Sequence, residues 1–186
     1  MAFRLLLLLI FSLCLAVPAW TAEVAGVKID DKARVGDAEL SLTGAGLRKR
    51  VFFQVYAIGL YVLDPKADPV SQPGPKRVQI HMLREVGAEQ FIDALAEGIK
   101  ENHSEAQAKA LEPRVKELGA TMAAIKEAKK GMVIALDWNG SATQLMIDGK
   151  PAGRPIEGQD FYRALLRIWL GDKPVQEDLK KALLGA

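Results

Sequence analysis

Three side chains that together could hold an oxygen anion or a carbonyl recur at intervals of four in LRKRVFFQVY, residues 47–56. They are Arg48, Phe52 and Tyr56. In an unbroken strand, residues four apart point to the same side, so a guanidinium would lie beside two aromatic rings. A guanidinium stays charged and offers a planar fork of donors, which suits such an oxygen. The other interpretation is that Arg48, Lys49 and Arg50 occupy a solvated edge or pair with carboxylates elsewhere.

The segment that positions these side chains runs from Leu40 to Asp64. Its first residues alternate between apolar and polar, the pattern of a half-buried strand. Gly44 and Gly46 then interrupt the alternation, and residues without a Cβ allow a strand to bend, bulge or accept a close neighbour. Residues 47–62 carry apolar side chains on both parities, which predicts one long strand that is covered on both faces.

The rest of the chain alternates between strand patterns and helix patterns. Strands are predicted at 23–29, 33–42, 76–84, 132–136 and 142–147, and helices from residue 88, from residue 105, at 159–170 and at 177–184. Ser104 is a predicted N-cap, and the Asn139-Gly140 pair is a strong hairpin signal. Short turns between consecutive strands predict an antiparallel sheet. Amphipathic helices that pack on it give an α+β fold in two layers.

The first 22 residues have the pattern of a secretory signal peptide. Arg4 precedes an apolar run from Leu5 to Val17, and small residues follow at Ala19 and Ala22. We expect cleavage near residues 19 to 22, export to the periplasm or the medium, and one domain over residues 23–186. The apolar run is short for a membrane span, so no stable span is expected after cleavage, although an uncleaved anchor is an alternative.

Composition excludes several kinds of function. The single cysteine, Cys14, lies inside the leader, so the predicted mature protein has no disulfide, cysteine nucleophile or thiolate metal site. The formal net charge of +2 falls by one when Arg4 is removed, which gives no electrostatic case for nucleic acid as a partner. Nucleophile-elbow, phosphate-loop and zinc-protease motifs are absent from the sequence, and we expect neither a metal nor a cofactor.

Two well-separated motifs resemble the chalcone isomerase superfamily. GAGLR (residues 44–48) followed by VYAIGLYV (55–62) is similar to that family's GAG-x-R segment and AIG-x-Y strand, and IEGQDFYRALLRIWLG (156–171) is similar to its last-but-one helix with a closing glycine. The resemblance implies an open-faced β-sandwich, in which a large antiparallel sheet carries a layer of helices on one face. It also implies a ligand cleft between the sheet and the helices.

The resemblance assigns a catalytic role to one residue, whereas the other positions of the family's site carry different residues here. Arg48 matches the arginine that stabilises negative charge in the family's ring-closing reaction, and a fixed cation in a dry cleft suits that role. Tyr56 stands where the plant enzymes have a threonine, and Phe91 where they have a tyrosine. The positions of the family's helix asparagine and of its later threonine fall near Gly98 and Gly153. Four of the five positions are therefore replaced.

Three functions follow from this resemblance. The first is an isomerase of the intramolecular-lyase type that acts on a small aromatic or enone compound, with Arg48 and Tyr56 as catalytic residues. The second is a non-catalytic binder of a fatty acid or another apolar carboxylate. Either ligand would be small, apolar or aromatic, with an anionic or carbonyl group, and would contact Arg48, Phe52, Tyr56 and Phe91. The third is an exported scaffold or interaction module.

Overall fold

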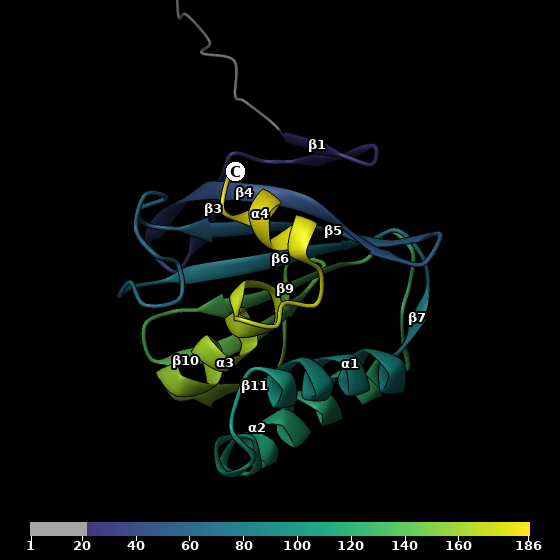
Figure 1. The fold of residues 1–186 in the computed structure, drawn as a ribbon, viewed down its shortest axis with the longest axis vertical. Coiled ribbons are helices and arrows are strands. Elements are labelled where there is room, and N and C mark those ends of the chain that lie inside the picture. The colour runs from purple at the N-terminus through teal and green to yellow at the C-terminus, as the bar shows by residue number, and fades with distance from the viewer. Residues whose placement is uncertain (1–21) are drawn as a thin grey trace, which may run out of the picture.

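The computed structural model describes residues 22–186, and its centre is a curled antiparallel sheet of seven strands (Figure 1). The predicted signal peptide lies outside the described residues, apart from Ala22. The strand order across the sheet is β11-β10-β9-β6-β5-β4-β3. The strands are β3 (Lys32–Val35), β4 (Ala38–Arg50), β5 (Phe53–Val62), β6 (Lys76–Met82), β9 (Val133–Trp138), β10 (Ala142–Ile147) and β11 (Lys150–Glu157).

Four helices pack on this sheet, and the predicted α+β architecture with helices on one face is confirmed (Figure 1). They are α1 (Ala88–Glu101), α2 (Glu105–Ala124), α3 (Gln159–Leu170) and α4 (Glu177–Leu183). Ser104 caps α2 as predicted, because its hydroxyl accepts a hydrogen bond from the backbone N–H of Gln107. Two short strands, β7 (Val86–Gly87) and β8 (Glu127–Ala128), pair with each other beside α1 and α2.

The sheet is buried on both faces at β5, as its apolar run predicts. Ile58, Leu60 and Val62 belong to the main core, which they share with the helices. Ala57 and Tyr61 point to the opposite face and pack in a second, smaller core. A separate hairpin of β1 (Ala22–Val24) and β2 (Val27–Ile29) contributes to that second core.

Two segments predicted as single strands are hairpins. Residues 23–29 form β1 and β2, which turn at Ala25 and Gly26 with φ angles of 51° and 81°. Residues 33–42 are divided between β3 and β4 by a turn at Gly36, whose φ is 57°. Periodicity overlooked both turns because the residues on either side of each remain compatible with a strand.

The prediction of one strand from residue 47 to 62 is also wrong. β4 ends at Arg50, Val51 and Phe52 form a two-residue turn, and β5 begins at Phe53, which pairs with Arg50. The register also shifts between Arg48 and Lys49, as at a β-bulge. The alternation of sides along the segment therefore does not continue from Arg48 to Phe52.

The two glycines of the GAG segment allow α4 to lie directly against β4. A Cβ on Gly44 would lie 2.1 Å from the carbonyl oxygen of Ala182, and one on Gly46 would lie 2.6 Å from Leu179 Cδ1. Any larger residue would therefore push the helix away from the strand. Of the three roles considered for these glycines, the structure shows the acceptance of a close neighbour, which is α4.

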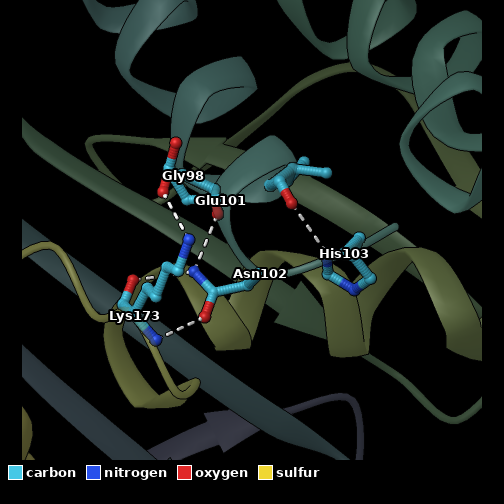
Figure 2. A network of polar contacts seen from close by, with 6 residues as sticks. Gly98, Glu101, Asn102, His103 and Lys173 are labelled. Carbon is cyan, nitrogen blue, oxygen red and sulfur yellow. Dashed lines mark hydrogen bonds and ion pairs between the residues drawn. The ribbon is translucent and has the colours of Figure 1, made fainter. Parts of the chain in front are cut away.

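A polar network at the end of α1 connects this helix to the loop between α3 and α4 (Figure 2). Asn102 Nδ2 donates to the carbonyl oxygens of Gly98 and Lys173 at 2.9 and 2.8 Å, and Asn102 Oδ1 accepts from the backbone N–H of Lys173 at 2.9 Å. A Cβ on Gly171 would lie 2.2 Å from Asn102 Oδ1, so the helix-closing glycine is required by this close approach. The network holds two segments that border the cavity described next.

Candidate functional site

A cavity of about 320 Å³ lies between the sheet and helices α1 and α3. Most of its wall is apolar: Ile80 and Met82 come from β6, Leu95 from α1, and Ile168 and Trp169 from α3. Exposed residues, among them Arg50, Phe53 and Arg84, line its mouth. An apolar space with a few polar groups at one end is the usual form of a site for a small molecule.

Arg48 lines this cavity from β4, as the sequence predicted, and its side chain is half-buried. Its guanidinium Nη1 donates to the carbonyl oxygen of Lys49 and lies 3.4 Å from Gln176 Oε1. Within residues 22–186, the ion pairs of the structure do not include Arg48. The alternative that Arg48 pairs with a carboxylate is therefore not observed in the described part of the chain.

Gln176 fixes the strand that carries Arg48. Its Oε1 accepts from the backbone N–H of Lys49 at 2.9 Å, and its Nε2 donates to the carbonyl oxygen of Leu47 at 3.2 Å. Gln176 is the residue that immediately precedes α4, the helix that Gly44 and Gly46 admit to the surface of β4. The GAG segment therefore influences the site through α4, which brings the Gln176 amide to the register shift beside Arg48.

Tyr56 lies directly opposite Arg48 in the β4–β5 pair and also lines the cavity. Its hydroxyl oxygen accepts a hydrogen bond from Trp169 Nε1 at 2.9 Å. Burial raises the pKa of Tyr56, while the Trp169 hydrogen bond and the nearby Arg48 charge oppose this rise. The phenol therefore stays protonated near neutral pH, and its proton is left to donate to a third group.

Phe91 lines the cavity from α1, where it is half-buried. Because it has no hydroxyl, it contributes apolar surface and no proton. Gly98, on the same helix, packs against Ile168 and is not among the residues that line the cavity. Gly153 lies in β11, where it packs against Thr121. The two glycines therefore lie outside the cavity.

Phe52, which was predicted to contact a ligand, lies outside the cavity and is 94% exposed. The cause is the turn at Val51 and Phe52, which carries the ring away from the face that Arg48 and Tyr56 share. Phe53 takes the place at the mouth, where the Arg84 guanidinium carbon lies 4.5 Å from its ring centroid. Recognition of the turn would have identified Phe53, but the usual Asn-Gly signal of a two-residue turn is missing.

Sequence reasoning did not identify several other residues at the site. Trp169 is not among the predicted site residues, although its indole N–H reaches the Tyr56 hydroxyl. Arg84 and Gln176 carried no signal, because each is an isolated polar residue near the end of an element. A second guanidinium and an amide can be assigned to the site only when the strands and helices are placed in space.

No helix within residues 22–186 is long and apolar enough to cross a bilayer. Over the same residues, no group of three or more His, Cys, Asp or Glu side chains gathers where it could hold a metal ion.

Comparison with known proteins connects this geometry to a family. A search of curated proteins found no matching sequence. Among solved structures, the crystal structure of a fatty-acid binding protein from Arabidopsis thaliana superposes with a TM-score of 0.67 at 16% identity, over 86% of this chain and 92% of that one. At this identity the likeness shows the shared fold. The family model described as chalcone isomerase-like matches residues 21–185, nearly the whole described chain, and the protein therefore belongs to the chalcone isomerase-like family.

Proposed function

We propose that the protein binds a fatty acid or another apolar carboxylate in the cavity between the sheet and helices α1 and α3. The observation that carries this proposal is Arg48, a half-buried guanidinium without an ion-pair partner among residues 22–186, at the edge of an apolar space. Removing an unpaired charge from water is costly, so such a group favours an anionic ligand. The apolar wall then accommodates the remainder of that ligand.

The polar end of the cavity suits a carboxylate head group. The Arg48 guanidinium supplies charge-assisted donors, and the Tyr56 hydroxyl supplies a further donor whose proton the Trp169 bond does not use. Arg50 and Arg84 add positive charge at the mouth, against Glu85 as the one carboxylate among the cavity-lining residues. An anionic ligand would therefore be attracted to the mouth before it reaches Arg48.

Two further facts support this proposal. The Arabidopsis protein with the same fold is a fatty-acid binding protein, which makes a fatty acid a reasonable ligand to test first. The cavity volume of about 320 Å³ is at the lower end of the usual range for small-molecule sites, about 300–1,000 Å³. A short or medium acyl chain should therefore fit better than a long one.

Calorimetric titration with octanoate, laurate and palmitate tests the proposal. We expect binding of at least one acid, with an affinity that falls roughly 10- to 100-fold in Arg48→Gln, because a hydrogen bond to a charged group contributes about 1.5–3 kcal/mol. Arg154→Gln is the matched control, since Arg154 is exposed on β11 and does not line the cavity. Absence of binding by all three acids would contradict the proposal, as would equal affinities of the two variants.

A second candidate function is the ring-closing isomerase reaction, and the pairing of Arg48 with Tyr56 favours it. A guanidinium and a phenol that face each other across two strands could stabilise an oxyanion that develops on a bound enone. Incubation with naringenin chalcone tests this function. Closure faster than the spontaneous rate, lost in Arg48→Gln, would support an isomerase, whereas an unchanged rate would remove this candidate.

We also propose that the protein acts outside the cytoplasm, because its first 22 residues have the charge, apolar run and small residues of a secretory leader. Expression in a bacterium, followed by separation of periplasm and cytoplasm, tests this location. We expect a periplasmic protein whose mass places its N-terminus near residues 20 to 23. A full-length cytoplasmic protein would contradict the proposal.

A further inference from the structure

The hairpin tip, residues 49–53 between β4 and β5, exposes three consecutive large apolar side chains. Val51 is 80% exposed, Phe52 94% and Phe53 59%. The only other exposed large apolar side chains among residues 22–186 are Leu63 and Leu184, which lie singly elsewhere. Scattered exposed apolar residues are ordinary, but a contiguous group indicates an interaction surface.

The fold of the hairpin does not account for this composition. Val51 has a φ of 55°, in a region that β-branched residues avoid, and two-residue turns prefer asparagine, aspartate or glycine at such a position. A valine there is unfavourable for the turn, and the exposed Phe52 ring adds little packing. The presence of Val51 and Phe52 at this turn is better explained by a binding partner that covers their side chains.

Positive charge surrounds the apolar tip. Lys49 and Arg50, the first two residues of the tip, precede its apolar side chains and are exposed, and the exposed Arg84 lies over the Phe53 ring. None of these three residues takes part in an ion pair within residues 22–186. The tip therefore combines protruding apolar side chains with three nearby cations that form no ion pair among the described residues.

This combination fits an anionic lipid surface better than a second copy of the chain. Phenylalanine and valine side chains can enter the boundary between head groups and acyl chains, while lysine and arginine attract the anionic head groups. A stable protein interface needs about 800 Å² from each partner, contributed by 20 to 30 residues, and a five-residue tip falls far short. Two tips of equal positive charge would also repel each other.

We propose that the hairpin tip is a docking surface for anionic lipid bilayers. Phe53 and Arg50 belong both to the tip and to the mouth of the cavity, so docking would place the mouth against the lipid. The inference goes beyond the proposed ligand binding and does not rest on it, because the tip would dock whether the cavity is empty or filled.

Cosedimentation with lipid vesicles tests the proposal, on protein recovered after export and of known N-terminal mass. We expect binding to vesicles of equal parts phosphatidylcholine and phosphatidylglycerol, at least tenfold weaker binding to phosphatidylcholine alone, and weakening by 0.5 M salt. The double variant Val51→Asn with Phe52→Ser should lose at least tenfold in affinity for the anionic vesicles. Leu63→Ser, which removes an exposed apolar side chain at the other end of β5, should bind as the unaltered protein does.

Two variants with the same change of charge distinguish an electrostatic effect on vesicle binding from an effect of misfolding. Lys49→Glu should weaken binding to the anionic vesicles severalfold, and Lys150→Glu, an equal charge change at the exposed start of β11, should weaken it less. Thermal melting monitors the fold, and Val51→Asn should not lower the melting temperature because asparagine tolerates positive φ better. Failure of the unaltered protein to bind anionic vesicles would overturn the proposal. Equal binding of the tip variant and the unaltered protein would also overturn it. A dimer in sedimentation velocity that only the tip variant abolishes would overturn it as well.

Discussion

Arg48 keeps its place through neutral partners, and this decides what it can do. The carbonyl of Lys49 and the amide of Gln176 orient the guanidinium without cancelling its charge. A carboxylate partner would have neutralised it and left little preference for an anionic ligand. The residue is thus oriented by the fold and electrostatically available to a ligand in the cavity.

Tyr56 and Trp169 form a pair whose removal has a predictable cost. Tyr56→Phe deletes the acceptor of the Trp169 indole N–H, and Trp169 is only 2% exposed. A buried donor without a partner costs about 1–3 kcal/mol, so we expect a loss of that size in the free energy of unfolding measured with urea. In a Trp169→Phe background the same substitution should cost much less, since no donor remains. An equal loss in both backgrounds would contradict the pairing.

Three of the four predicted ligand-contacting residues line the cavity, although the alternation that linked two of them is interrupted by a turn. Arg48 and Tyr56 were assigned to one site, and the structure brings both to the cavity, although they come from opposite strands of a hairpin. Phe91 was assigned through the resemblance and also lines the cavity. Phe52 was misplaced because a valine occupies the positive-φ position of the turn, where the usual glycine or asparagine signal is absent.

At the scale of elements, the amide of Asn102 connects α1 to the loop that leads into α4 (Figure 2). Asn102→Ala removes three hydrogen bonds, and we expect a loss of about 1–3 kcal/mol in the free energy of unfolding, because bonds at a partly exposed site contribute modestly. Urea unfolding measures it. Glu101→Ala is the control, since it removes only an exposed ion pair with Lys173 and should cause no measurable change. A comparable loss in both variants would argue against this role.

The first residue of β6 is a buried cation. Lys76 is 1% exposed, and its ammonium donates to the carbonyl oxygens of Gln72 and Gly74 at 2.6 and 3.1 Å. Burial, with a contribution from the charge of Arg163, lowers the pKa of Lys76 from 10.5 to about 8. Between these two values the unfolded chain binds more protons than the folded chain, so stability should rise with pH in this window and fall as pH drops toward 8.

Comparison with Lys76→Met isolates this effect. The free energy of unfolding of the unaltered protein, minus that of the variant, should increase from pH 8 to pH 10.5 by up to roughly 3 kcal/mol. Other titrating groups are common to both proteins and cancel in the difference. Denaturant unfolding at several pH values measures it, and a difference that is flat or falls with pH would show that Lys76 keeps an ordinary pKa.

Elements with strong periodicity were predicted well, and short elements were not. The amphipathic α3 agrees with its predicted bounds, whereas the predicted strands do not include β11, because Gly153 and Pro155 interrupt its pattern. As an edge strand of the sheet, β11 tolerates both residues. The turns at residues 25–26 and 36 were missed for a related reason, since single positive-φ positions leave little trace in hydrophobic patterns.

At the scale of the whole molecule, the fold class followed from the order of elements, while the cavity did not. Antiparallel strands with helices on one face could be derived from turns and periodicity. The cavity between β6, α1 and α3 exists because the surrounding side chains do not fill that space. No local sequence pattern indicates where side chains leave a space unfilled. The family resemblance supplied the cleft, and packing of α4 on Gly44 and Gly46 explains how the GAG segment supports the site.

The measurement that tests the central claim most directly compares laurate with dodecanol, which has the same chain length but no charge, in the unaltered protein and in Arg48→Gln. If Arg48 recognises a carboxylate, laurate should bind the unaltered protein at least tenfold more tightly than dodecanol does, and this preference should largely vanish in the variant, whose affinity for dodecanol should change little. An equal preference for laurate in both proteins, or no preference in either, would contradict the account.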